Sequence, residues 1–79
     1  KNISKIEMTN IAKSTLDYIK ESVRNKNISG NYNDTETIND YEIRKIVEED
    51  EYYYKCYKIV IEVKKKEQIR RLESYVLQQ

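Results

Sequence analysis

Lysine and arginine gather in the stretch KKKEQIRR, residues 64–71, which carries five basic side chains in eight residues. Basic side chains at this density bind phosphates, because each cation replaces counterions held by a nucleic-acid backbone. We therefore predict a nucleic-acid-binding surface there, with DNA favoured over RNA. Its expected centre consists of Lys64, Lys65, Lys66, Arg70 and Arg71.

Two further basic residues and two tyrosines are expected to widen this surface. Arg44 and Lys58 alternate with apolar positions, which places them on the polar side of a predicted sheet. Tyr52 and Tyr54 have the same parity as Lys58, so they would share that side and stack on bases or donate to phosphates. Tyr53 would then point into the core.

An ordinary solvated surface is the competing interpretation of the same residues. Ile, Lys, Asn and Tyr together make up 37 of the 79 residues, and an AT-rich genome favours the codons of all four. In such a genome lysine and tyrosine accumulate without selection for binding. Size and composition are typical of small accessory or regulatory proteins of mobile elements and phages, which is an association and not a physical argument.

The residue types that most catalytic and metal sites require are missing. The chain has no histidine, and Cys56 is its only cysteine. This excludes an internal disulfide and a cysteine-based zinc site, and it removes the commonest general base. No sequence feature indicates two carboxylates held in a cleft. We therefore expect no catalytic residues, no metal, no cofactor and no enzymatic activity.

Acidic residues gather just before the tyrosines. Residues 34–51 carry eight acidic and two basic side chains, a net charge of −6, and end in the run EEDE at 48–51. This run lacks the spaced ligands and the glycine of a calcium loop. It is typical of a solvated hairpin tip or of a docking surface. The alternative function is therefore a protein–protein interaction module that docks through an acidic hairpin and an open strand edge.

Helical periodicity appears at both ends of the chain. Apolar residues recur at helical spacing over residues 3–27, and the Asn, Gly and Asp content of residues 25–35 favours a loop. From residue 65 onward Ile69, Leu72 and Val76 return to a helical period. We therefore predict a long N-terminal helix and a C-terminal helix.

Strict alternation predicts a strand over residues 52–63, and residues 40–47 are its nearest partner in an antiparallel hairpin. Placing Val47 opposite Glu51 puts the apolar residues of both strands on one face. The predicted fold is a small α+β domain of order α-β-β-α. A winged-helix-like fold with residues 36–48 helical is the alternative.

The length fits one small binding domain over residues 1–79, or a fragment of a longer chain whose residues before Lys1 are missing. Two strands make a marginal sheet and leave an open edge, so we expect a homodimer. There is no apolar run long enough to span a membrane, and no signal peptide is visible. We therefore expect a cytoplasmic location and no membrane partner.

Overall fold

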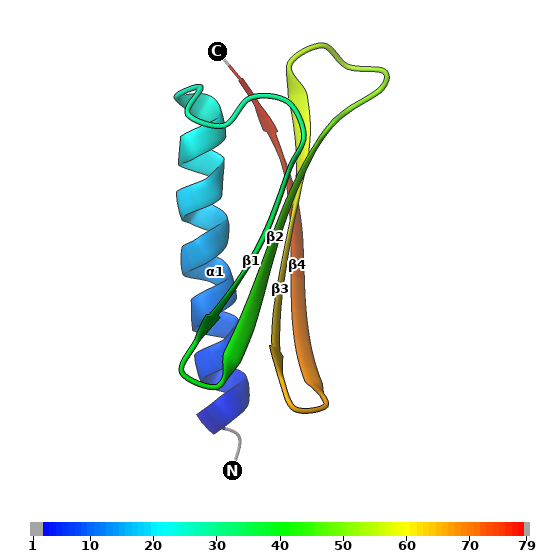
Figure 1. Ribbon diagram of the computed structural model, residues 1–79. Coiled ribbons are helices and arrows are strands. Elements are labelled where there is room, and N and C mark those ends of the chain that lie inside the picture. Colours follow the sequence, from blue (N-terminus) through cyan, green and yellow to red (C-terminus); the bar gives the residue numbers. More distant parts are fainter. Residues whose placement is uncertain (1–2, 79) are drawn as a thin grey trace.

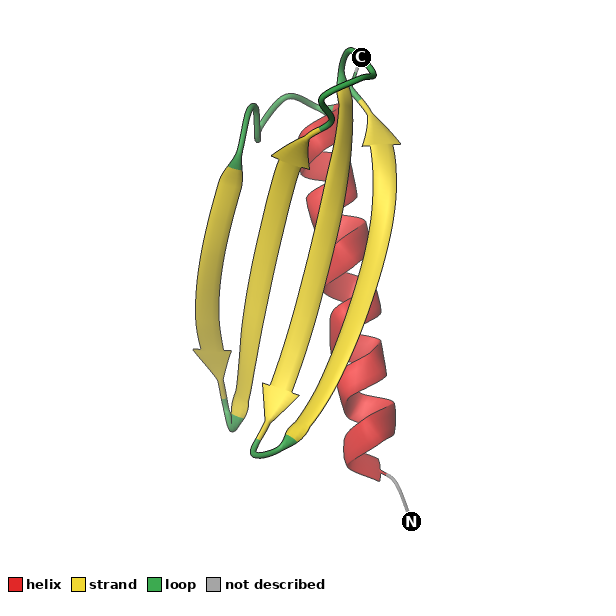
Figure 2. Ribbon diagram, turned by 90° about the vertical axis from the view of Figure 1, so that its right-hand side faces the viewer, coloured by secondary structure: helices red, strands yellow, loops and turns green. Residues whose placement is uncertain are grey.

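The computed structural model describes residues 3–78, with side chains from residue 5 onward, as one helix packed on an antiparallel sheet. The elements are α1 (Ile3–Arg24), β1 (Tyr32–Ile38), β2 (Tyr41–Glu49), β3 (Cys56–Lys65) and β4 (Gln68–Leu77). The strands form a meander in the order β1-β2-β3-β4. The helix covers one face of the sheet, the inner face, and the outer face carries no other element of the described chain (Figure 1, Figure 2).

The helix α1 packs on the sheet through one apolar stripe, and the prediction of an N-terminal helix is confirmed. Met8, Ala12, Ile19 and Val23 are four or seven residues apart, and each is at most 1% exposed. Their burial against the strands stabilises the helix more than its intrinsic propensity does. Within residues 3–78, no helix combines the length and the apolar character needed to cross a membrane.

The apolar core lies between α1 and the inner face of the sheet. Its strand residues are Tyr41, Ile43 and Val47 of β2, Tyr57, Ile59, Ile61 and Val63 of β3, and Val76 of β4. The predicted hairpin between residues 40–47 and 52–63 exists as β2 and β3, although Val47 pairs with Ile59 and not with Glu51. The predicted partner of Val47, Glu51, and the observed partner, Ile59, are an even number of residues apart. The side chains of the two paired strands therefore keep their predicted faces.

The predicted C-terminal helix is wrong, and so is the α-β-β-α order. Residues 68–77 form β4, which pairs with β3 along its whole length. The spacing of Ile69, Leu72 and Val76 fits a helix, but in β4 Leu72 and Val76 face the core while Ile69 faces outward. Backbone groups on both edges of the buried strand β3 need partners, which β2 and β4 supply together.

The strand β1 was not predicted: its first four residues were assigned to the loop 25–35, and the rest to a segment whose alternative was a helix. It joins β2 through a two-residue turn, Asn39–Asp40, in which Asn39 is left-handed with φ of 56°. Asparagine tolerates this conformation better than most residues, so Asn39 was the turn signal in the sequence. The winged-helix alternative is wrong, because residues 36–48 are extended on both sides of this turn.

The tyrosine run lies outside the strand in which it was predicted. β3 begins at Cys56, so Tyr52, Tyr53 and Tyr54 belong to the β2–β3 loop, residues 50–55. Tyr53, which was expected in the core, is 69% exposed. The strand prediction failed here because tyrosine and lysine continue the alternating pattern into the loop, although the backbone turns back before Cys56.

Buried and exposed isoleucines provide a test of the sheet. We expect Ile61→Val in β3 to lower the free energy of unfolding by about 0.5–1.5 kcal/mol, since it leaves a small cavity in the core. The matched change Ile69→Val, at a side chain 61% exposed, should cost less than about 0.5 kcal/mol. Urea unfolding measures both. An equal loss from the two variants would favour the C-terminal helix, in which Ile69 is buried.

Candidate functional site

The residues predicted to bind nucleic acid do not form one patch. Tyr52 and Tyr54 lie in the β2–β3 loop at one end of the sheet, whereas Lys64–Lys66 lie at the β3–β4 turn at the other end (Figure 1). The two ends are joined by β3, whose ten residues span about 33 Å at roughly 3.3 Å per residue. A compact ligand therefore does not contact the tyrosines and these lysines together.

Three of the predicted residues meet on the outer face, where carboxylates neutralise them. Arg71 lies 3.2 Å from Glu62 and 3.0 Å from Glu73. Arg44 reaches Glu62 at 4.0 Å, and Lys58 reaches Glu73 at 3.7 Å. These five residues, the outer charge ladder, alternate in sign across β2, β3 and β4. A phosphate would have to compete with a carboxylate for each of the three cations.

Two other predicted residues point to the inner face and hold the β3–β4 hairpin against α1. Arg70 Nε donates to Thr9 Oγ1 at 2.9 Å. Lys65 Nζ lies 5.1 Å from the centre of the Tyr41 ring, and the Tyr41 hydroxyl donates to Glu7 of α1. Arg70 and Arg71 thus serve opposite faces, because successive side chains of a strand alternate.

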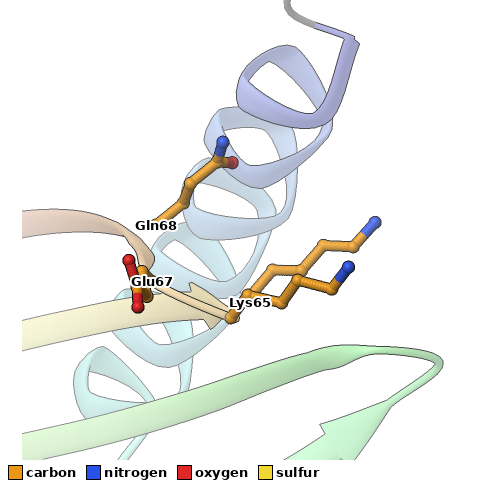
Figure 3. Close-up of a pocket in the computed structure, with 4 residues that line it drawn as sticks. Lys65, Glu67 and Gln68 are labelled. Atoms are coloured by element: carbon orange, nitrogen blue, oxygen red, sulfur yellow. The ribbon is translucent and has the colours of Figure 1, made fainter.

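Of the predicted nucleic-acid-binding residues, the basic side chains at the β3–β4 turn are the ones that an anion could reach without displacing a carboxylate. A hollow of about 730 Å³ beside it is lined by Lys65, Lys66, Glu67 and Gln68. Figure 3 shows Lys65 and Glu67 pointing to opposite sides of the turn, with Gln68 directed toward α1. Lys64, Lys65 and Lys66, the turn lysine cluster, form no ion pair with a carboxylate of residues 3–78.

Hydrogen bonds fix the backbone of the β2–β3 loop at the opposite end. One carboxylate oxygen of Asp50 accepts from the N–H of Tyr52 at 2.9 Å and from that of Tyr53 at 2.8 Å. The Asp50 N–H donates to the Cys56 carbonyl at 2.8 Å, and the Cys56 N–H donates to the Tyr53 carbonyl at 3.2 Å. The loop is therefore an ordered platform for its side chains.

This platform presents three tyrosines to solvent, with Tyr52, Tyr53 and Tyr54 exposed by 86%, 69% and 87%. A pocket of about 340 Å³, the loop pocket, opens beside them. It is lined by Glu49, Asp50, Tyr53, Tyr54, Lys55, Cys56, Tyr57 and Gln78. Residues 48–55 carry four acidic and one basic side chain, a net charge of −3. Aromatic faces beside carboxylates attract cations, so the loop pocket is the candidate site.

Sequence reasoning singled out these acids and tyrosines, but it assigned them to two different surfaces and did not predict the pocket. The tyrosines were placed in a strand, and Tyr53 was assigned to the core. Tyr57 was correctly predicted to face inward, and its hydroxyl donates to Glu49 at 3.4 Å. Cys56, expected in the middle of a strand, is half-buried at the start of β3. The sequence did contain a signal for a turn at this point, namely Asp50. An aspartate side chain often accepts hydrogen bonds from backbone N–H groups two or three residues later, which closes a turn.

A polar cluster on the inner face of β1 and β2 was not predicted at all. Lys45 Nζ donates to Glu36 and lies 3.5 Å from Asp34. The Lys45 side chain is only 14% exposed, and the hydrogen bond to Glu36 raises its pKa above the ordinary value. Both carboxylates stand on β1, so the cluster could be recognised only after that strand had been found.

No group of three or more Cys, Asp or Glu side chains within residues 3–78 is arranged to hold a metal ion. No protein-family model matches the chain, and neither a curated protein nor a solved structure matches it. A functional proposal therefore rests on the geometry and electrostatics of the chain itself.

The Lys45 cluster gives a pH-dependent contribution to stability. Because the pKa of Lys45 is raised in the folded state, its contribution is complete below the unfolded pKa, about 10.4, and is lost as the pH rises through the folded pKa. We expect Lys45→Met to lower the free energy of unfolding by roughly 1 kcal/mol at pH 7. This difference from the wild type should shrink above about pH 10.4.

Urea unfolding of both proteins at several pH values measures this difference. Contributions that the two proteins share cancel when their free energies of unfolding are subtracted at each pH, so the difference isolates Lys45. The matched control is Lys64→Met at an exposed residue, with an expected cost below about 0.5 kcal/mol. A difference that already disappears between pH 7 and 9 would contradict the assignment.

Proposed function

We propose that the chain is a non-enzymatic protein-interaction domain that binds a lysine- or arginine-bearing segment of another protein at the loop pocket. The observation that carries this proposal is the loop pocket, in which the exposed Tyr53 and Tyr54 lie beside Glu49 and Asp50, with the exposed Tyr52 next to them in the loop. A contiguous exposed aromatic patch on a small domain is typical of an interaction surface. Tyrosine is also among the residues that contribute most to binding energy at protein interfaces.

Cation–π attraction and carboxylate pairing both favour a basic partner. An ammonium or guanidinium group over a tyrosine ring gains about 0.5–1 kcal/mol at an exposed site. Lys55 adopts this arrangement within the loop, with its Nζ 5.5 Å from the centre of the Tyr54 ring. A cation of the partner would bind in the same way, and Glu49 would add an attraction that weakens with salt.

The rigidity of the loop lowers the entropic cost of binding. Asp50 already restrains the backbone of Tyr52 and Tyr53 by hydrogen bonds. A tyrosine side chain has only two rotatable bonds to fix when it contacts a partner. Binding at the loop pocket therefore loses less free energy to the ordering of the loop than binding at a flexible segment would.

Removal of two rings from the loop pocket tests this proposal. We expect Tyr53→Ser with Tyr54→Ser to weaken the binding of a short lysine- and arginine-rich peptide about tenfold, because two cation–π contacts are lost. Fluorescence anisotropy of the labelled peptide measures the affinity. The same peptide with glutamate at each basic position should not bind.

The control for this variant is Tyr18→Ser, which removes a ring that is 69% exposed on α1, away from the loop pocket. Its affinity for the basic peptide should equal that of the wild type. Equal binding of basic and acidic peptides, or wild-type affinity in the double variant, would exclude the loop pocket as a cation site.

Nucleic-acid binding is the second candidate function, and the turn lysine cluster is the observation that favours it. Its three cations are exposed or half-exposed, and two of them, Lys65 and Lys66, line an open hollow. Arg44, Lys58 and Arg71 contribute less than the sequence suggested, because the outer charge ladder engages them. Any phosphate contact would therefore be confined to the end of the sheet that carries the β3–β4 turn.

Charge reversal tests this second candidate. Under it, Lys64→Glu with Lys66→Glu lowers the affinity for duplex DNA at least about tenfold and flattens its salt dependence. Anisotropy with labelled duplex DNA, single-stranded DNA and RNA at two salt concentrations gives both quantities. Lys13→Glu with Lys26→Glu is the control, with the same charge change at exposed residues outside the turn. Affinity that is unaffected by reversal at the turn eliminates this candidate.

A cytoplasmic location and homodimerisation remain predictions. The sheet has two open edges, β1 and β4, and either could in principle accept a further strand. The side chains of the two edges differ enough to distinguish between them.

A further inference from the structure

The free edge of β4 carries apolar as well as charged exposed side chains. Ile69, Tyr75 and Leu77 are 61%, 60% and 67% exposed, and no strand of residues 3–78 pairs with the second edge of β4. The helix lies on the inner side of β3 and β4, so the outer side is open (Figure 2). A ten-residue strand with an unpaired, partly apolar edge is a template for another strand.

We propose that β4 pairs with β4 of a second copy of this chain, antiparallel and about a twofold axis at Leu72. The two sheets then form one continuous eight-stranded sheet. In this register the numbers of two facing residues always sum to 144. The pairs therefore run from Gln68 opposite the partner's Val76 to Val76 opposite the partner's Gln68. The surface involved is separate from the loop pocket, and the proposal does not depend on it.

The register about Leu72 matches side chains in chemistry. On the outer face Ile69 lies opposite the partner's Tyr75, and Arg71 lies opposite the partner's Glu73. On the inner face the two Leu72 side chains meet at the axis. Opposite charges and apolar pairs placed directly across two strands stabilise the pairing.

Neighbouring registers lack this match. An axis at Arg70, Arg71 or Glu73 would place that charged residue opposite its own copy, and like charges directly opposite are destabilising. An axis at Ser74 would place Arg71 opposite Leu77, with no charge pair at all. Among axes at residues 70–74, only the one at Leu72 opposes unlike charges.

The outer charge ladder supports the same register. Arg71 and Glu73 stand at its β4 end, and their side chains are 50% and 44% exposed, so each can contact a further charged group in addition to its two partners within the chain. In the dimer the ladders of the two copies meet at the axis, and each Arg71 gains the partner's Glu73. The row of alternating charge formed by Arg44, Glu62 and Arg71 is thereby extended across the axis by the partner's Glu73.

The other open edge is unsuited to self-pairing. Asp34 and Glu36 lie on the inner face of β1, at two adjacent positions of that face. An axis at residue 34, 35 or 36 places one carboxylate opposite another, and Lys45 of the same chain already pairs with both. Self-association is therefore expected at β4.

A charge exchange tests the interface. We expect wild-type protein to sediment as a dimer, and Arg71→Glu or Glu73→Arg alone to self-associate at least about tenfold more weakly, because like charges then face each other twice. An equimolar mixture of these two variants should restore the dimer as a heterodimer. The changes within each chain are the same before and after mixing, so only the interface explains the restoration.

Three results would overturn the proposal: a monomeric wild type at all concentrations, variants that dimerise like the wild type, or a mixture that stays monomeric. A cysteine placed at the axis tests the register independently. In a Cys56→Ser background, which removes the only native cysteine, Leu72→Cys should form an intermolecular disulfide on mild oxidation. Leu77→Cys should not, since the two copies of residue 77 would stand about 33 Å apart. Equal cross-linking at both positions would contradict the axis at Leu72.

Discussion

Burial of the inner face of β3 beneath α1 is the interaction on which the rest of the structure depends. Ile59, Ile61 and Val63 are fully buried there, and α1 packs on β3 and β4. The strand β1 lies at the far edge of the sheet. Since the main helix contact falls on the other side, the inner face of β1 can carry the acids Asp34 and Glu36, which Lys45 neutralises. Both the core and the unpredicted polar cluster follow from where the helix packs.

The sequence was sufficient for the elements with one unambiguous period. The stripe of α1 and the alternation from Tyr57 to Val63 each fit one kind of element, and both predictions are confirmed. The spacing of Ile69, Leu72 and Val76 in β4 fits a helix, although as a strand only Leu72 and Val76 face the core. Short apolar sets of this kind do not distinguish helix from strand. The second edge of β3 needs a strand to pair with, and this requirement, which depends on the whole sheet, makes the segment a strand.

The error in the C-terminal element also determined which residues were grouped as a site. A helix can bring basic residues one turn apart onto one side, whereas a strand sends Arg70 and Arg71 to opposite faces. Glu62 and Glu73, which neutralise the outer cations, become their neighbours only through cross-strand pairing. The number of charges was therefore readable from the sequence, but their distribution over the surface was not. The acids and tyrosines around Asp50 lie together because a hairpin loop keeps sequence neighbours together, although the prediction assigned Tyr52 and Tyr54 to the basic surface and the acids to a separate docking surface.

The meander topology has a consequence for the order in which the chain becomes structured. Every strand pairs with its neighbour in sequence across a short connection, so the sheet can grow hairpin by hairpin at little entropic cost. The helix is the exception, because it is synthesised first and packs on the last two strands to be made. Its stripe of Met8, Ala12, Ile19 and Val23 stays uncovered until β3 and β4 have left the ribosome. During synthesis, α1 therefore exposes its apolar stripe longest, and it is the segment that most needs a chaperone to prevent premature aggregation.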